Sequence, residues 1–187
     1  MRLHAFALLL FFLSDPILAA RWDRPFIDEQ EAPTPSSVED RDTTWKEAGT
    51  PLPPWFKDGD LVEFQVDDPS SRFRQYIDAR TIAVGSDGAV RYTLVTESPS
   101  GVRNVSFEGL RCTPRGAFKI YAYGNDGRFE KADGEWQKIR GYDKVHRDLH
   151  KFILCIPREF KPRPKKDMIR FMRTAVPHET NTGFQAD

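Results

Sequence analysis

The chain lacks any apolar run long enough to cross a bilayer. Its longest uninterrupted apolar stretch covers the nine residues 5–13, whereas a membrane-spanning helix needs about 20. Arg2 precedes this stretch, and the small residues Ala19 and Ala20 follow it, an order that is typical of a secretory signal peptide. We therefore expect residues 1–20 to direct export, and we expect no stable membrane span.

Cysteine is scarce, because Cys112 and Cys155 are the only two in the chain. Thiols of exported proteins tend to pair in an oxidising compartment, so we expect one disulfide. Closing a loop of about 44 residues would stabilise the fold by roughly 4 kcal/mol in the chain-entropy model. A bonded pair also excludes a free cysteine nucleophile.

The chain has no net charge, because 28 Lys and Arg residues balance 28 Asp and Glu residues. This balance argues against a global field that attracts nucleic acid. The charge is uneven, however: residues 23–68 hold 13 acids and 4 bases, and residues 144–173 hold 10 bases and 3 acids. Either the two segments partly neutralise each other in the fold, or the basic segment binds an anionic partner.

Familiar catalytic signatures are missing as well. The sequence contains no G-x-S-x-G elbow, P-loop, dinucleotide-binding glycine pattern or EF-hand loop, so the corresponding enzyme and calcium-binding classes lose support. Histidine is rare, and only His146 and His150, with Asp143 one turn earlier, have a spacing that suits a metal. Because Arg147 replaces the Glu of an H-E-x-x-H motif and no further ligand set is visible, we expect a structural pair and no metal. Since no catalytic signature is present, we also expect no cofactor and no enzymatic activity.

The dominant pattern from residue 61 to residue 139 is an alternation of apolar and polar residues, which predicts half-buried β-strands. Turn-forming segments at residues 85–88, 99–101 and 125–127 separate these runs and favour tight antiparallel connections. We predict roughly six to eight antiparallel strands that form a sandwich, a curled sheet or a partly open barrel. The alternating apolar residues include Val62, Phe64, Val66, Val90, Tyr92 and Leu94.

The period changes after Gly141. Apolar residues then recur at helical spacing towards Cys155, with Asp143 near the start, and this predicts a helix of about three turns. A second short apolar helix is expected at residues 168–172. Near the other end of the domain, Trp55 and Phe56 follow a proline-rich run and are expected to cover the core.

The predicted fold is therefore α+β and mainly β, with one or two C-terminal helices in a single domain at residues 43–174. Residues 21–42 are acidic, contain closely spaced prolines and are expected to form a flexible linker. Residues 175–187 are expected to form a disordered tail.

Basic and aromatic residues surround the first cysteine and continue into the next expected strand. This mixture predicts a binding patch for sugars or anionic groups, through stacking and charge-assisted hydrogen bonds. Alternatively, these residues have no binding role, because basic and aromatic side chains are common on the solvent-facing side of antiparallel strands. The patch comprises Arg111, Arg115, Lys119, Tyr121 and Tyr123.

The segments D-G-A-V-R-Y at residues 87–92 and N-V-S-F-E-G-L-R-C at residues 104–112, followed by Trp136, resemble the CNP1-like family. This is a group of exported proteins of Gram-negative bacteria, and the resemblance covers about residues 45–155. It implies a periplasmic location and brings no established activity, so it assigns no catalytic residue. The family also suggests a lipoprotein, but no cysteine stands near the expected cleavage site, so we expect no lipid anchor. The family-motif matches are Arg91, Tyr92, Glu108, Gly109 and Arg111.

Together these features predict a soluble periplasmic protein that binds an envelope protein or another envelope component and does not act as an enzyme. Two alternatives stay open. The basic segment at residues 144–173 binds lipopolysaccharide or another polyanion, or the chain is a hydrolase or metal-dependent enzyme of an unrecognised type.

Overall fold

The computed structural model describes residues 45–174. The expected signal peptide at residues 1–20, the linker at residues 21–42 and the tail at residues 175–187 lie outside the described residues.

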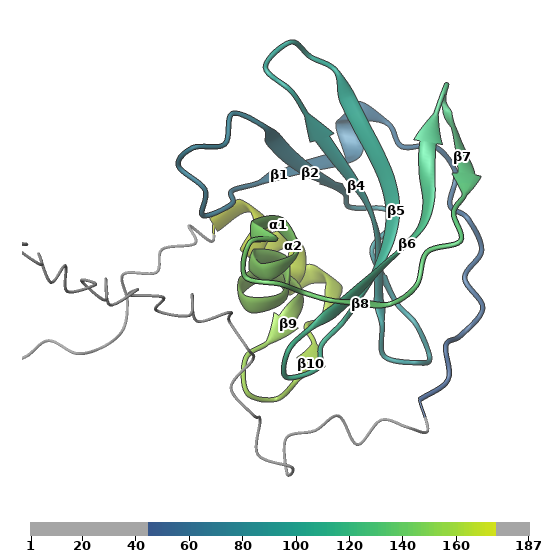
Figure 1. The fold of residues 1–187 in the computed structure, drawn as a ribbon, viewed down its shortest axis with the longest axis vertical. Coiled ribbons are helices and arrows are strands. Elements are labelled where there is room, and N and C mark those ends of the chain that lie inside the picture. Colours follow the sequence, from purple (N-terminus) through teal and green to yellow (C-terminus); the bar gives the residue numbers. More distant parts are fainter. Residues whose placement is uncertain (1–44, 175–187) are drawn as a thin grey trace, which may run out of the picture. The chain divides into compact units, whose positions relative to one another are not determined.

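Eight strands form one antiparallel sheet (Figure 1). The strands are β1 (Leu61–Phe64), β2 (Arg74–Asp78), β3 (Ala83–Val84), β4 (Val90–Glu97), β5 (Arg103–Arg111), β6 (Ala117–Asn125), β7 (Arg128–Lys131) and β8 (Gln137–Lys138). The main path runs β1-β2-β4-β5-β6-β7, with β3 paired to β4 and β8 paired to β6. Because the spatial order follows the chain order, short turns suffice to connect the strands.

The helices follow the sheet in the chain and pack against one of its faces (Figure 1). Helix α1 (Lys144–Asp148) continues into a π-helical segment, η2 (Leu149–Leu154). Helix α2 (Lys165–Thr174) is the last element of the described residues. A two-stranded hairpin of β9 (Cys155–Ile156) and β10 (Lys161–Pro162) separates η2 from α2. A 3-10 turn, η1 (Asp58–Asp60), precedes β1. None of the helices in residues 45–174 is long and apolar enough to cross a membrane.

The alternation of residues along the strands gives the sheet two apolar faces. Val90, Tyr92 and Leu94 on β4 belong to the larger core, together with residues of η2 and α2 such as Ile153 and Met168. Burial of these side chains attaches the helical layer to the sheet. On the opposite face, a smaller cluster of Tyr76, Val95 and Val105 packs against Trp55 and Phe56. The chain before β1 therefore covers the face that the helices leave open.

The expected turns connect the strands at the predicted positions. The β4–β5 turn places Gly101 at a φ of 81°, and the β6–β7 turn places Asp126 and Gly127 at φ values of 46° and 78°. Two successive residues with positive φ are typical of the tight turn that matches the twist of a β-hairpin. The predicted mainly β fold with C-terminal helices is thus confirmed, and strands β1 to β8 form one open sheet.

The predicted disulfide is present. Cys112 follows β5 directly and Cys155 opens β9, and their Cα atoms lie 5.6 Å apart. Both side chains belong to the larger core, where they contact the helical layer. The bond therefore ties the β9–β10 hairpin to the centre of the sheet.

Replacing both cysteines, in a Cys112→Ala/Cys155→Ala variant, is expected to lower the free energy of unfolding by about 2 to 5 kcal/mol, because the unfolded chain regains the entropy that the loop had lost. Urea unfolding measures the loss directly. Reductant is the control: it should destabilise the natural chain to a similar extent and leave the variant unaffected. Equal stability of the two proteins without reductant would contradict this account.

Candidate functional site

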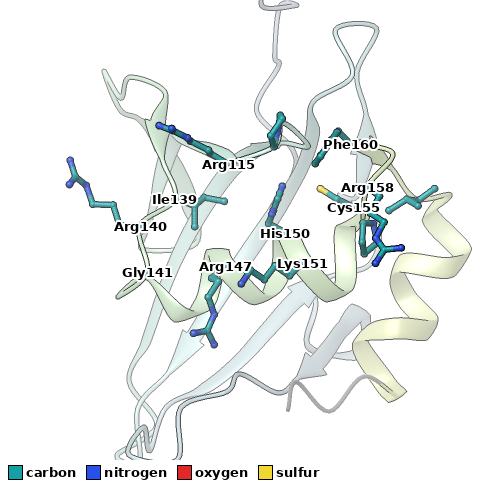
Figure 2. Close-up of a pocket in the computed structure, with 13 residues that line it drawn as sticks. Arg115, Ile139, Arg140, Gly141, Arg147, His150, Lys151, Cys155, Arg158 and Phe160 are labelled. Carbon is teal, nitrogen blue, oxygen red and sulfur yellow. The ribbon is translucent and has the colours of Figure 1, made fainter. Parts of the chain in front are cut away.

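A cavity of about 360 Å³ lies where the β5–β6 loop, the segment before α1 and the β9–β10 hairpin meet along α1 and η2 (Figure 2). The hairpin comes close to the sheet because the disulfide joins its first residue to the end of β5. Basic side chains surround the cavity, and no described residue that lines it is acidic. The basic residues are Arg115, Arg140, Arg147, Lys151 and Arg158.

One of these cations has a structural role. Arg147 donates from Nε to Asp148, at 2.8 Å, and from a terminal nitrogen to Asp67, at 3.5 Å. Asp148 is fully buried and also accepts the backbone N–H of Asp67 at 2.7 Å. This network joins α1 to the loop after β1, and it offsets much of the charge of Arg147.

The remaining charge at the cavity is concentrated on its rim. Arg140, Lys151 and Arg158 are exposed, and across residues 45–174 none of the three forms an ion pair. They come from three separate elements: the segment before α1, η2 and the β9–β10 hairpin. The fold therefore brings together like charges that the sequence keeps apart.

His150 projects from η2 into the same cavity. Its Nε2 lies 2.9 Å from the carbonyl oxygen of Thr113. Because a carbonyl only accepts, Nε2 carries the hydrogen and donates it. Burial lowers the pKa of His150 from its ordinary value, and Lys151 acts in the same direction, so the ring is neutral near pH 7 and adds a polar group without a charge.

The β9–β10 hairpin has an unusual backbone at the rim of the cavity. Arg158 and Phe160 have φ values of 69° and 52°, a region that costs residues other than glycine roughly 1 kcal/mol or more. The phenyl ring of Phe160 remains 47% exposed. Pairing of Lys161 with Ile156 and of Pro162 with Cys155 holds this loop in place. The rim is thus fixed before any ligand binds.

The wall of the cavity is apolar. Its residues include Ile139, Ile156, Pro157 and Phe160, together with the bonded Cys155. Figure 2 shows Ile139, His150 and Cys155 in the middle of the group, with Arg140, Arg147, Lys151 and Arg158 around them. The cavity therefore presents apolar surface inside a cationic rim.

The second histidine, His146, faces the sheet instead. It lies between two carboxylates, with Nδ1 2.7 Å from Asp143 and Nε2 2.9 Å from Glu108, and its ring stacks on Phe118 at 3.7 Å. Burial opposes a charge on His146, but the bonds to Asp143 and Glu108 outweigh it and raise its pKa to about 9. His146 is therefore an imidazolium that connects the start of α1 to β5.

The two histidines do not converge on a common ligand site, although they lie one turn apart. His146 is held by Glu108 and Asp143, whereas His150 reaches Thr113. No group of three or more His, Cys, Asp or Glu residues within the described part of the chain is placed to hold a metal ion.

The residues of the predicted basic and aromatic patch are divided among three places. Arg111 lies over the ring of Trp45 at 3.9 Å, and Lys119 pairs with Glu47 at 2.9 Å, so residues 45–56 cover this part of the sheet. Arg115 lies at the cationic cavity. Tyr123 is 55% exposed and follows a register shift in the β5–β6 pairing.

The register shift explains the division. Ile120 pairs with Glu108 and Ala122 with Phe107, so Tyr121 is an extra residue on β6. A β-bulge of this kind reverses the alternation of faces beyond it. Tyr121 consequently packs against Phe107, while Tyr123 turns to the other face of the sheet.

A second hollow, of about 520 Å³, lies between residues 47–52 and strands β6 and β7. Lys119 and Lys131 line it, but so do the acids Glu47, Asp133 and Glu135. Its mixed charge gives no clear preference for an anion, and Lys119 is already paired with Glu47. The cationic cavity is the stronger candidate.

A protein-family model, that of the CNP1-like family, matches residues 40–173, which is nearly the whole described domain. The chain belongs to the CNP1-like family. No curated protein and no solved structure matches it. The residues that carry the CNP1-like motif can therefore be interpreted only from their own contacts.

Those contacts give the CNP1-like motif residues structural roles. Arg91 forms a buried pair with Asp87, at 2.6 Å, and Asp87 also accepts the backbone N–H of Ala48 at 2.9 Å. The Arg91 guanidinium keeps the pKa of Asp87 well below its usual range. A Cβ on Gly109 would lie 2.8 Å from the ring of Tyr121. Tyr92 is fully buried in the core.

The rim of the cavity in this CNP1-like domain lies outside these motif positions. Arg140, Lys151, Arg158 and Phe160 were not predicted as site residues. The excess of bases in residues 144–173 indicated where positive charge is abundant, but it did not show that only part of it faces a cavity.

The charged state of His146 should make stability depend on pH. Its pKa is raised from 6.5 to about 9, so its contribution, on the order of 3 kcal/mol, is complete below about pH 6.5 and is lost as pH rises through about 9. NMR titration of the His146 ring measures this pKa, and Glu108→Gln should lower it. His150→Gln is the matched control and should leave it unchanged. A His146 pKa at or below 6.5 would overturn this prediction.

Asp87→Asn is expected to destabilise the domain by about 3 to 5 kcal/mol, because it leaves the Arg91 charge buried without its partner. The side chains of Arg91 and Asp87 are only 7% and 1% exposed. Denaturant unfolding provides the measurement. Glu63→Gln breaks an exposed pair with Arg74 and should cost less than about 1 kcal/mol, so equal effects of the two substitutions would argue against a special role for the buried pair.

Proposed function

We propose that the chain is a periplasmic, non-enzymatic binding module that holds the anionic group of a cell-envelope component in the cationic cavity. The observation that carries this proposal is the composition of the lining, which among residues 45–174 has five basic residues, no acid and an apolar interior. Like charges brought together in this way repel one another, and a bound anion reverses the sign of that interaction.

The available cations suit an anion chemically. Arg140, Lys151 and Arg158 are exposed at the rim, so they can contact a ligand while their charged ends stay partly hydrated. Guanidinium groups bind carboxylates and phosphates through paired, charge-assisted hydrogen bonds. His150 adds a neutral ring to the same lining.

Two features support a periplasmic location. The Cys112–Cys155 disulfide suits an oxidising compartment. Membership of the CNP1-like family agrees with the resemblance to exported proteins that the sequence indicated.

The lining also supports binding rather than catalysis. Among the described residues around the cavity there is no Ser, Thr, Asp or Glu to act as nucleophile or carboxylate base. Cys155 is bonded and so offers no free thiol.

A single cavity is favoured over attachment of the whole basic segment to a polyanion. Only Arg147, Lys151 and Arg158 of that segment line the cavity, while Arg115 and Arg140 come from outside it. A volume of about 360 Å³ lies at the lower end of the range of small-ligand sites, about 300 to 1,000 Å³. It suits one small anionic group.

Calorimetric titration with inorganic pyrophosphate tests the proposal. One saturable site is expected, with an affinity that falls as salt is added. Arg140→Gln/Arg158→Asn should weaken binding at least about tenfold, and asparagine is chosen at residue 158 because it tolerates positive φ. Arg173→Gln, on the exposed end of α2, is the control for a general charge effect. An equal loss in the control, absence of saturation, or hydrolysis of the pyrophosphate by the purified protein would contradict the proposal.

A further inference from the structure

We infer that the cavity takes a small amphiphilic anion: one phosphate or carboxylate group attached to an apolar body of a few carbons, bound as a free molecule from solution. This inference rests on the proposed function and specifies its ligand. It follows from the way in which charge and apolar surface are arranged around the cavity.

A purely ionic ligand would not contact the apolar interior of the cavity. Ile139, Ile156 and Pro157 belong to its wall, and Figure 2 shows basic side chains on different sides of Ile139 and Cys155. An inorganic anion held by the rim would leave this apolar surface in contact with water. A ligand with an apolar body removes the same surface from water, and that burial is favourable in proportion to its area.

Phe160 provides a second and independent indication. Its ring is 47% exposed at the rim, although its backbone has the positive φ of 52° that a bulky residue rarely adopts. Strain of this kind persists where surrounding structure holds it, and it concentrates at binding sites. Here the β9–β10 pairing holds the loop. The apolar body of a ligand would cover the exposed ring.

The geometry also limits the size of the ligand. The cavity volume is about 360 Å³, close to the smallest sites that bind organic molecules. Arg140, Lys151 and Arg158 line this small space, so one anionic group is expected to interact with more than one of them, whereas Arg147 is already paired with Asp148. A long polyanion could contact only the rim and would leave the apolar wall uncovered.

Three probes separate the contributions of charge and apolar surface. Hexyl phosphate carries both, methyl phosphate carries the same phosphate monoester with little apolar surface, and hexanol carries the apolar chain alone. Calorimetry with the full mature chain is expected to show hexyl phosphate binding at least about tenfold more tightly than methyl phosphate, with no saturable binding of hexanol. Hexyl phosphate should also displace pyrophosphate.

Two substitutions assign the preference to this cavity. Phe160→Asn introduces a residue that accepts positive φ and removes the ring, so it should reduce the advantage of hexyl phosphate over methyl phosphate at least about threefold. Arg140→Gln should weaken both phosphates by a similar factor. Arg173→Gln, away from the cavity, should change neither.

The outcomes distinguish this inference from the proposed function. Equal affinities for hexyl and methyl phosphate, with both lost in the Arg140→Gln/Arg158→Asn variant, would contradict the inference of an amphiphilic ligand. The same result would still support the proposed anion site. No binding of either phosphate or of pyrophosphate would overturn both. Binding of the protein to vesicles that contain phosphatidylglycerol, with no binding of hexyl phosphate, would contradict the inference that the ligand is a free small molecule. It would indicate that the protein binds a membrane surface instead.

Discussion

The disulfide between Cys112 and Cys155 is the constraint on which the rest of the structure depends. It connects the end of the central strand β5 to the hairpin that lies between η2 and α2. Without this connection, an open sheet and a short helical layer would be held together mainly by the apolar contacts of η2 and α2 with β1, β2, β4 and β5. With it, the β9–β10 hairpin stands beside the β5–β6 loop, and the two enclose the cationic cavity.

Buried charges are paired with opposite charges on both faces of the sheet. On the helical side, His146 is surrounded by Glu108 and Asp143, and its positive charge offsets theirs. On the opposite side, Arg91 and Asp87 form a pair that residues 45–56 cover. Both arrangements use buried charges to fix the position of an added segment, and each is satisfied by hydrogen bonds. The rim of the cavity differs, because its exposed cations have no such partners among the described residues.

Much of the fold was predictable because strand and turn formation depend on neighbouring residues. The alternation around Val90, Tyr92 and Leu94 correctly indicated a strand, although the structure buries both faces of β4 rather than one. The glycines at residues 101 and 127 marked real turns. The scarcity of cysteine indicated the disulfide. The bulge at Tyr121 was not predictable in the same way, since the alternation of residues gives no sign that the partner strand skips a position. That single register shift separated Tyr121 from Tyr123 and divided the expected patch.

The uneven charge of the sequence led to two alternatives, and residues 45–174 show how some of the acids are paired. Asp58 pairs with Arg103 and Glu63 with Arg74, so these acids are used within the sheet and its neighbouring loops. Among residues 45–174, Asp67 with Arg147 is the one ion pair that joins the acidic segment to the basic one.

Among the described residues, the acidic segment neutralises one residue of the basic segment, Arg147. The motif that identifies the family is explained by packing around Arg91 and Gly109, whereas the cavity is built from loops outside it. Membership of the CNP1-like family thus accounts for the scaffold, and the chemistry of the ligand has to be argued from the residues that the disulfide brings together.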